Sequence, residues 1–117
     1  KGDNFFVIDY KTTKKGPWRK TQANVHDDLQ LQSYARVVQR EFNVPADKIK
    51  TALYFLEGGE LVKASFPQKT LEAVEKKLLN VYNEIHDTDA DNVRGIVGKH
   101  CWRCDYRDRC PFFNTID

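Results

Sequence analysis

An acidic and a basic side chain stand two positions apart near the start of the chain, at Asp9 and Lys11. They belong to residues 5–12, FFVIDYKT, whose β-branched and aromatic residues predict a strand. Side chains two apart on a strand share a face, so we expect the carboxylate and the amine to lie together. A carboxylate is a hard ligand for Mg²⁺ or Mn²⁺, and a nearby lysine can hold an attacking water or neutralise charge on a phosphate. An ordinary surface ion pair gives the same pattern.

A second pair of polar residues, Gln30 and Tyr34, falls on a predicted helix over residues 27–42. Residues four apart share one side of a helix, so both side chains can reach one site. We expect that side to face the strand that carries Asp9. A core tyrosine with a satisfied hydroxyl group is the simpler interpretation of Tyr34 alone.

All three cysteines, Cys101, Cys104 and Cys110, lie within ten residues of one another. Such clustering favours a zinc or iron–sulfur site over disulfides in an intracellular protein. Three thiolates are one ligand short of a closed tetrahedral zinc site or a four-iron cluster, and His100 could complete a zinc site. Reduced cysteines packed in a core are less favoured, because the flanking residues are mostly charged.

Five elements are expected to position these residues. The first strand is almost continuously apolar in its first half, which predicts a strand buried on both faces. Asp27 or Asp28 can cap the first helix, with Leu29, Gln32, Ala35, Val38 and Phe42 on its apolar side. Two strands flank the Gly58-Gly59 pair as a hairpin, and a second amphipathic helix follows. These last three elements cover residues 49–56, 61–66 and 68–86. The order strand, helix, hairpin, helix and tail predicts an α/β fold with a mixed sheet.

The chain has 117 residues, of which 40% are hydrophobic and 31% charged, the balance of one globular domain, residues 1–117. The longest strongly apolar stretch, residues 5–8, is far below the ~20 residues of a membrane span. Without a signal peptide, the sequence predicts an intracellular, cytoplasmic protein. A net charge of +2 is too small to identify a nucleic-acid partner. Basic residues nevertheless cluster in the predicted loop 13–24, where a phosphate backbone or only solvent could meet Lys14, Lys15, Arg19 and Lys20.

Taken together, these motifs resemble the RecB-type branch of the PD-(D/E)XK nuclease superfamily. The likeness rests on residues 7–12, VIDYKT, then on residues 30–34, the hairpin and the cysteine-bearing ending. It is nearest to the iron–sulfur nuclease domains of AddB-like helicase–nucleases and CRISPR adaptation nucleases. The resemblance implies a restriction-endonuclease-like mixed sheet with flanking helices.

The resemblance also implies roles for single residues. Asp9 matches the metal-binding acid of the (D/E)-x-K motif, and Tyr10 would offer its backbone carbonyl to the same metal. Lys11 matches the catalytic lysine. Gln30 and Tyr34 match a Gln-x-x-x-Tyr motif that borders the site and contacts the DNA backbone or orients the catalytic groups.

In the family the three cysteines would be the last ligands of a 4Fe–4S cluster whose first cysteine lies upstream, and residues 99–113 would form the cluster segment. A histidine and a second metal-binding aspartate normally precede the (D/E)-x-K strand, and neither is found here. We therefore expect a nuclease domain without its N-terminal part, inactive as an isolated fragment and holding neither a complete cluster nor a tightly bound metal.

The leading functional hypothesis is a Mg²⁺- or Mn²⁺-dependent deoxyribonuclease, an exonuclease acting on DNA ends or single strands in recombination, repair or CRISPR adaptation. A helicase domain or subunit is a possible partner. A DNA-binding module that keeps the nuclease fold without cutting is one alternative. A zinc-binding interaction module, with His100 as fourth ligand, is the other.

Overall fold

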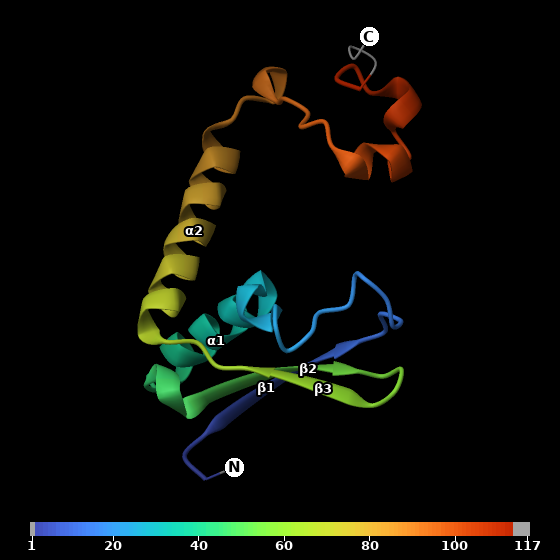
Figure 1. Cartoon of the computed structure of the whole chain (residues 1–117). Helices are drawn as coiled ribbons and strands as arrows, with labels where there is room; N and C mark the ends of the chain where they lie inside the picture. The colour runs from blue at the N-terminus through green and yellow to red at the C-terminus, as the bar shows by residue number, and fades with distance from the viewer. Residues whose placement is uncertain (1, 114–117) are drawn as a thin grey trace. The chain divides into compact units, whose positions relative to one another are not determined.

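The computed structural model describes residues 2–113. Contacts within the chain divide it into two compact units, Lys1–Val81 and Tyr82–Asp117. The first unit holds a sheet with the helix α1 (Leu29–Phe42) on one of its faces (Figure 1). No helix within residues 2–113 is both long enough and apolar enough to cross a membrane.

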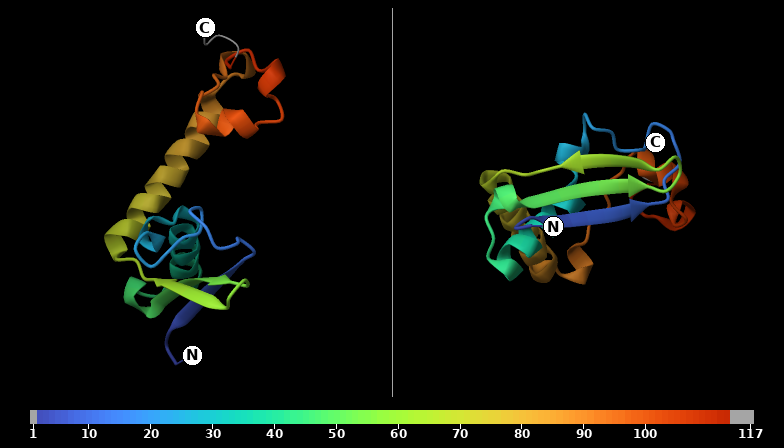
Figure 2. Two further views of the ribbon diagram at one scale, coloured as in Figure 1. Left: turned by 45° about the vertical axis from the view of Figure 1, so that its right-hand side comes forward. Right: turned by 90° about the horizontal axis from the view of Figure 1, so that it is seen from below.

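The sheet has three strands, in the order β1 (Phe5–Lys11), β2 (Ile49–Phe55) and β3 (Glu60–Ala64). β1 pairs with β2 in parallel and β2 with β3 antiparallel, an arrangement seen from the uncovered face in the right panel of Figure 2. Parallel neighbours need a crossover connection, and α1 (Leu29–Phe42) supplies it. The expected mixed sheet is therefore confirmed.

β1 differs from its prediction as a strand buried on both faces. Among residues 2–113 it is an edge strand, and its residues alternate between half-buried and exposed. Phe6, Ile8 and Tyr10 are exposed because the face of the sheet opposite α1 has no covering layer in the described chain. The apolar run correctly indicated a strand but not its surroundings.

α1 begins where the sequence places its cap. The side chain of Asp28 accepts a hydrogen bond from the backbone N–H of Leu31 at 2.9 Å, and Asn43 ends the helix in the left-handed conformation. The predicted apolar side is partly wrong. Its buried side is Leu31, Ala35 and Gln39, whereas Leu29 and Phe42 are exposed. The adjacent side of the helix, with Gln30 and Tyr34, faces the end of β1.

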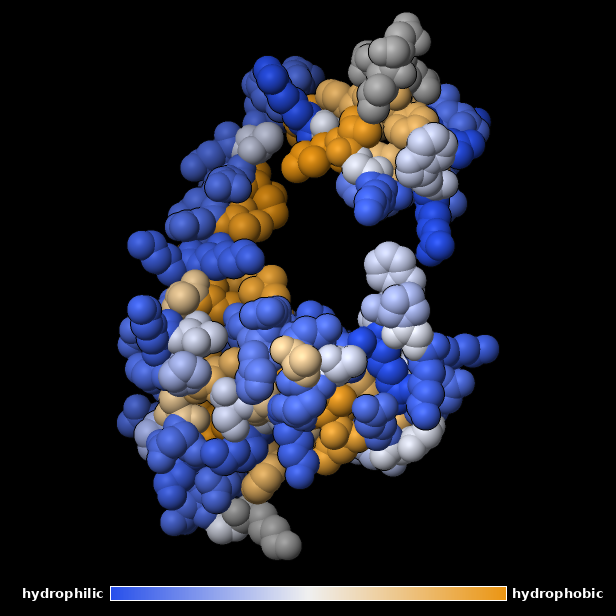
Figure 3. Space-filling model, viewed as in Figure 1, coloured by the Kyte–Doolittle hydropathy of each residue, from blue (hydrophilic) through white to orange (hydrophobic). Residues whose placement is uncertain are grey.

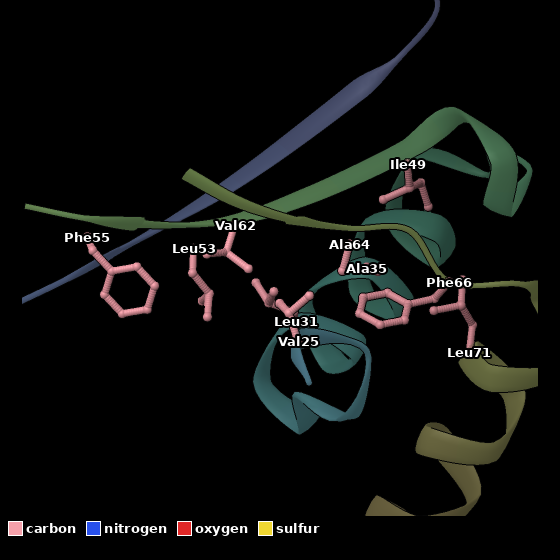
Figure 4. Close-up of a cluster of buried hydrophobic side chains, with 10 residues drawn as sticks. All are labelled: Val25, Leu31, Ala35, Ile49, Leu53, Phe55, Val62, Ala64, Phe66 and Leu71. Atoms are coloured by element: carbon pink, nitrogen blue, oxygen red, sulfur yellow. The ribbon is translucent and has the colours of Figure 1, made fainter. Parts of the chain in front are cut away.

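The core lies between the sheet and the helices. Its ten buried residues come from the 3-10 helix at Val25–Asp27, from α1, β2, β3 and the start of α2, and from the segment after β3 (Figure 4): Val25, Leu31, Ala35, Ile49, Leu53, Phe55, Val62, Ala64, Phe66 and Leu71. The strands supply alternate residues to it, as a half-covered sheet requires.

The hairpin between β2 and β3 turns at the glycine pair. Gly58 has φ of 86° and Gly59 of 63°, a region that residues with a Cβ adopt at a cost, so the sequence signal has a direct structural reason. After the hairpin, α2 spans Gln68–Asp87. Its apolar side is buried at Leu71 and Val74, and further along the helix its apolar residues are exposed (Figure 3): Leu78, Leu79, Val81, Tyr82 and Ile85.

The first part of α2 is tied to α1 by charged side chains. Glu75 accepts hydrogen bonds from Arg36, with an Nε–Oε2 distance of 2.7 Å, and from Arg40. The hydrogen bond from Arg36 holds the pKa of Glu75 below its ordinary value, against the opposing effect of desolvation. Beside this pair, the buried amide of Gln39 donates to Oε1 of Gln68 at 2.6 Å. These contacts help to fix α1, and with it the residues at its N-terminal end.

The second unit consists of short 3-10 helices after α2, at Ala90–Asn92, Lys99–Arg103 and Arg107–Arg109. The rings of Trp102 and Phe113 pack edge to face, with centroids 5.6 Å apart. Phe112 covers Gly95 so closely that a Cβ there would lie 2.5 Å from the ring.

Candidate active site

The end of β1 brings Asp9 and Lys11 onto one face of the sheet, as the strand spacing predicted. Nζ of Lys11 lies 2.8 Å from Oδ2 of Asp9. Both side chains are largely withdrawn from solvent, with 16% of Asp9 and 29% of Lys11 exposed. This is the face that α1 covers, so the pair differs from an ordinary surface ion pair by having a helix beside it.

α1 runs back along β1 and presents its first turns to this pair. Oε1 of Gln30 accepts a hydrogen bond from Nζ of Lys11 at 2.6 Å. Nε2 of Gln30 in turn donates to the hydroxyl of Tyr34 at 2.7 Å. At the other end of the helix, the ring of Phe42 packs on that of Phe5, 4.8 Å between centroids. The expectation that Gln30 and Tyr34 face the strand of Asp9 is confirmed.

The polar atoms at this point form a line from Asp9 through Lys11 and Gln30 to Tyr34. Oδ2 of Asp9 is buried and has no hydrogen bond from residues 2–113 beyond its ion pair with Lys11.

The side chain of Tyr10 points to the opposite, exposed face. The backbone carbonyl of Tyr10 is better placed to bind a metal than its side chain. The next carbonyl, of Lys11, points toward β2 and accepts a hydrogen bond from Leu56 N–H at 3.0 Å. Strand carbonyls alternate in direction, so the carbonyl of Tyr10 faces the open edge of β1.

These atoms suit a hard cation. Mg²⁺ is typically held by one or two carboxylates and keeps several waters, so Asp9 with the carbonyl of Tyr10 would form part of such a site. Within residues 2–113 no group of three or more His, Cys, Asp or Glu side chains is arranged to hold a metal ion. The donor set described here is therefore a partial one.

A family model described as the PD-(D/E)XK nuclease superfamily matches residues 1–111. The chain belongs to this superfamily. Its mixed sheet and two helices are consistent with a restriction-endonuclease-like fold. No curated protein and no solved structure gives a significant match.

Membership of the PD-(D/E)XK superfamily implies nuclease activity with DNA as substrate, and members typically use Mg²⁺ or Mn²⁺. The letters of the motif name correspond to the spacing of Asp9 and Lys11 on β1. The family match therefore relates the side chains at the end of β1 to the nuclease activity of the superfamily.

The loop 13–24 follows β1 directly and stands on the α1 side of the sheet (Figure 1). Of its predicted DNA-binding residues, Lys14 and Lys15 are exposed and Lys20 is half-buried. Arg19 is placed differently, because only 5% of its side chain is exposed. Its guanidinium lies 4.1 Å from the centre of the Phe55 ring, so its charge is turned into the protein and away from the surface that a phosphate would reach.

Sequence reasoning missed the partners that hold this loop. Nη2 of Arg19 donates to the backbone carbonyl of Glu57 at 2.9 Å, and the backbone N–H of Lys15 donates to the Glu57 carboxylate at 2.7 Å. The amide of Gln22 bonds both the carbonyl and the N–H of Lys63, at 2.6 and 3.1 Å. No local sequence signal identifies these partners, since each bond joins residues about forty positions apart.

The three cysteines of the second unit are not arranged as a site for a single metal ion within residues 2–113. Cys101, Cys104 and Cys110 are all free thiols, and Sγ of Cys101 accepts a hydrogen bond from the N–H of Gly98 at 3.4 Å. Neither these thiols nor His100 belong to a metal-ready cluster within residues 2–113.

Proposed function

We propose that this nuclease hydrolyses phosphodiester bonds of DNA ends or single strands with Mg²⁺ or Mn²⁺, in recombination, repair or CRISPR adaptation. One observation carries the proposal: the contacts that join Asp9, Lys11, Gln30 and Tyr34 lie at the motif position of a PD-(D/E)XK superfamily member. An accidental surface pair would have no reason to be held by a glutamine and a tyrosine from the facing helix.

Each residue has a distinct part in this proposal. Asp9 and the carbonyl of Tyr10 would hold the metal, which when bound supplies Lewis acidity and an activated water. Lys11 places a positive charge where negative charge develops on the phosphate. Gln30 fixes the position of the lysine amine, and Tyr34 fixes the amide of Gln30. The lysines of the loop 13–24 would attract the DNA backbone.

The decisive experiment compares Asp9→Asn with Asp47→Asn in the complete protein. Asp47 is an exposed aspartate before β2, so the two variants remove the same charge at different places. We expect Asp9→Asn to abolish cleavage in Mg²⁺ or Mn²⁺, and both variants to bind DNA in chelator as the wild type does. Cleavage by Asp9→Asn at the wild-type rate would contradict the proposal. DNA binding without metal-dependent cleavage by the wild type would favour the non-catalytic alternative.

A separate proposal concerns the cysteines and the RecB-like subtype. We propose that Cys101, Cys104 and Cys110 ligate a 4Fe–4S cluster in the complete protein, with a fourth ligand from elsewhere, and that a helicase domain or subunit acts with the nuclease. Their spacing and their charged neighbours support the ligation.

Metal analysis tests the cysteine proposal. Anaerobically purified complete protein should contain iron and acid-labile sulfide and absorb visible light, and Cys104→Ser should lose both. Stoichiometric zinc in a colourless protein would instead identify the zinc alternative with His100. Protein that contains neither iron nor zinc would contradict both the cluster and the zinc site.

A further inference from the structure

The loop 13–24 has an unusual distribution of burial at two adjacent residues. Trp18 is 82% exposed, whereas the side chain of Arg19 is only 5% exposed. Folding usually does the reverse, burying indoles and leaving guanidinium groups in water. The loop is therefore held by its charged residue, and its largest apolar side chain is left free.

Arg19 is well supported in this role. Its guanidinium stacks on Phe55, donates to the carbonyl of Glu57 and lies 3.4 Å from the carboxylate of Glu60. The N–H of Arg19 also donates to the carbonyl of Gly16 at 3.1 Å, closing a tight turn that contains Trp18. Pro17 restricts the backbone of the same turn. The indole thus projects from a turn that is fixed at its base.

Trp18 has basic residues near it on the same loop. Lys14 and Lys15 are exposed on the same loop, and Lys20 is partly exposed. The loop stands on the α1 side of the sheet (Figure 1). The side chains of Asp9 and Lys11 lie on the same side, because Lys11 contacts both Asp9 and Gln30 of α1. Trp18 follows Lys11 by seven residues, so the Cα atoms of the two residues are at most about 25 Å apart.

A fixed, exposed indole among lysines is the combination that binds single-stranded nucleic acid. Lysines attract the backbone, and an aromatic ring stacks with one unpaired base. Paired bases in a duplex already stack on their neighbours and offer no free face within the helix. We propose that Trp18 stacks with an unpaired base of single-stranded DNA and so directs this nuclease to single strands, with Arg19 as the residue that positions the turn. This inference rests on the proposed function.

Binding measurements in chelator test the stacking without requiring catalysis. The chain has two tryptophans, Trp18 and Trp102, so Trp102→Ala is a matched control for Trp18→Ala. With a fluorescein-labelled oligothymidylate, we expect Trp18→Ala to weaken binding about tenfold, the effect of losing one stacked base. Trp18→Phe should recover most of the affinity, and Trp102→Ala should bind as the wild type does. Binding to a duplex should change little in any variant.

Fluorescence gives a readout that a merely structural role would not change. In the Trp102→Phe variant, Trp18 is the remaining tryptophan, and a stacked base should quench its emission on addition of oligothymidylate. Unquenched emission together with wild-type affinity of Trp18→Ala would overturn the stacking proposal. The Asp9→Asn cleavage assay is independent of this result, so the failure of one proposal is distinguishable from the failure of the other.

Discussion

Nζ of Lys11 donates a hydrogen bond to Oε1 of Gln30, 2.6 Å away, and this contact joins the strand of the site to its helix. A carboxamide has an accepting end and a donating end. Because its oxygen accepts from Lys11, its nitrogen is left to donate, and it does so to the hydroxyl of Tyr34. Gln30 thereby orients the amine that also meets Asp9.

The first prediction is that Gln30 affects cleavage only through the amine of Lys11. Lys11→Met should lower the single-turnover cleavage rate roughly 100- to 1,000-fold, the usual effect of losing one preorganised electrostatic group. Gln30→Leu should lower it less, about tenfold, because the amine loses one hydrogen bond worth about 1.4 kcal/mol. The double variant should be no slower than Lys11→Met, since Gln30 acts through the lysine. Multiplied effects in the double variant would show that Gln30 acts independently.

The second prediction concerns Tyr34, one step further from the metal. Tyr34→Phe removes the acceptor of the Gln30 amide while keeping the ring, so cleavage should slow by less than the tenfold expected for Gln30→Leu. Tyr106→Phe is a suitable control, because Tyr106 is 75% exposed in the second unit. A Tyr34→Phe variant as slow as Lys11→Met would indicate that the hydroxyl touches the substrate directly.

The elements that could be predicted from sequence are those with local causes. Gly58 and Gly59 mark the hairpin because the turn needs positive φ, and Asp28 marks the start of α1 because its side chain caps the helix. The shared face of Asp9 and Lys11 follows from the two-residue period of a strand. Each of these features depends on residues close together in the chain.

The features that sequence reasoning missed have distant causes. Arg19 reads as one more basic residue of a loop, and only the folded hairpin reveals that Phe55 and Glu57 bury it. The burial of β1 also depends on which layers cover the sheet, and the residues of the strand do not specify those layers. The apolar pattern of α1 likewise does not encode which of its residues meet Lys11.

The third prediction follows from the burial of Arg19. Arg19→Ala removes the stacking on Phe55 and the hydrogen bond to the carbonyl of Glu57, so it should lower the free energy of unfolding by about 1–3 kcal/mol. The loop should also loosen, and trypsin should cut it faster after Lys14 and Lys15. Lys20→Ala, on the adjacent residue, should change neither quantity appreciably. Urea unfolding and limited proteolysis measure the two effects. An unchanged digestion rate in Arg19→Ala would contradict the anchoring role.

The last prediction is a pH dependence of stability that originates at Glu75. Hydrogen bonds and charge from Arg36, with a further contribution from Arg40, hold the pKa of this carboxyl below the ordinary 4.5 in the folded protein. A lowered folded-state pKa stabilises the fold above the unfolded value, and that contribution is lost as the pH falls through the folded pKa.

Urea unfolding of the wild type and of Glu75→Gln should therefore differ at neutral pH, with the wild type more stable. The difference should shrink as the pH is lowered past 4.5, because the unfolded chain takes up the proton first. Glu41→Gln, at an exposed position on α1, shows the effect of removing a carboxylate elsewhere. A Glu75→Gln deficit that stays constant into the acid range would mean that the variant acts through packing. Since Glu75 joins α2 to the helix that carries Gln30, the loss of this ion pair should also slow cleavage as the pH falls.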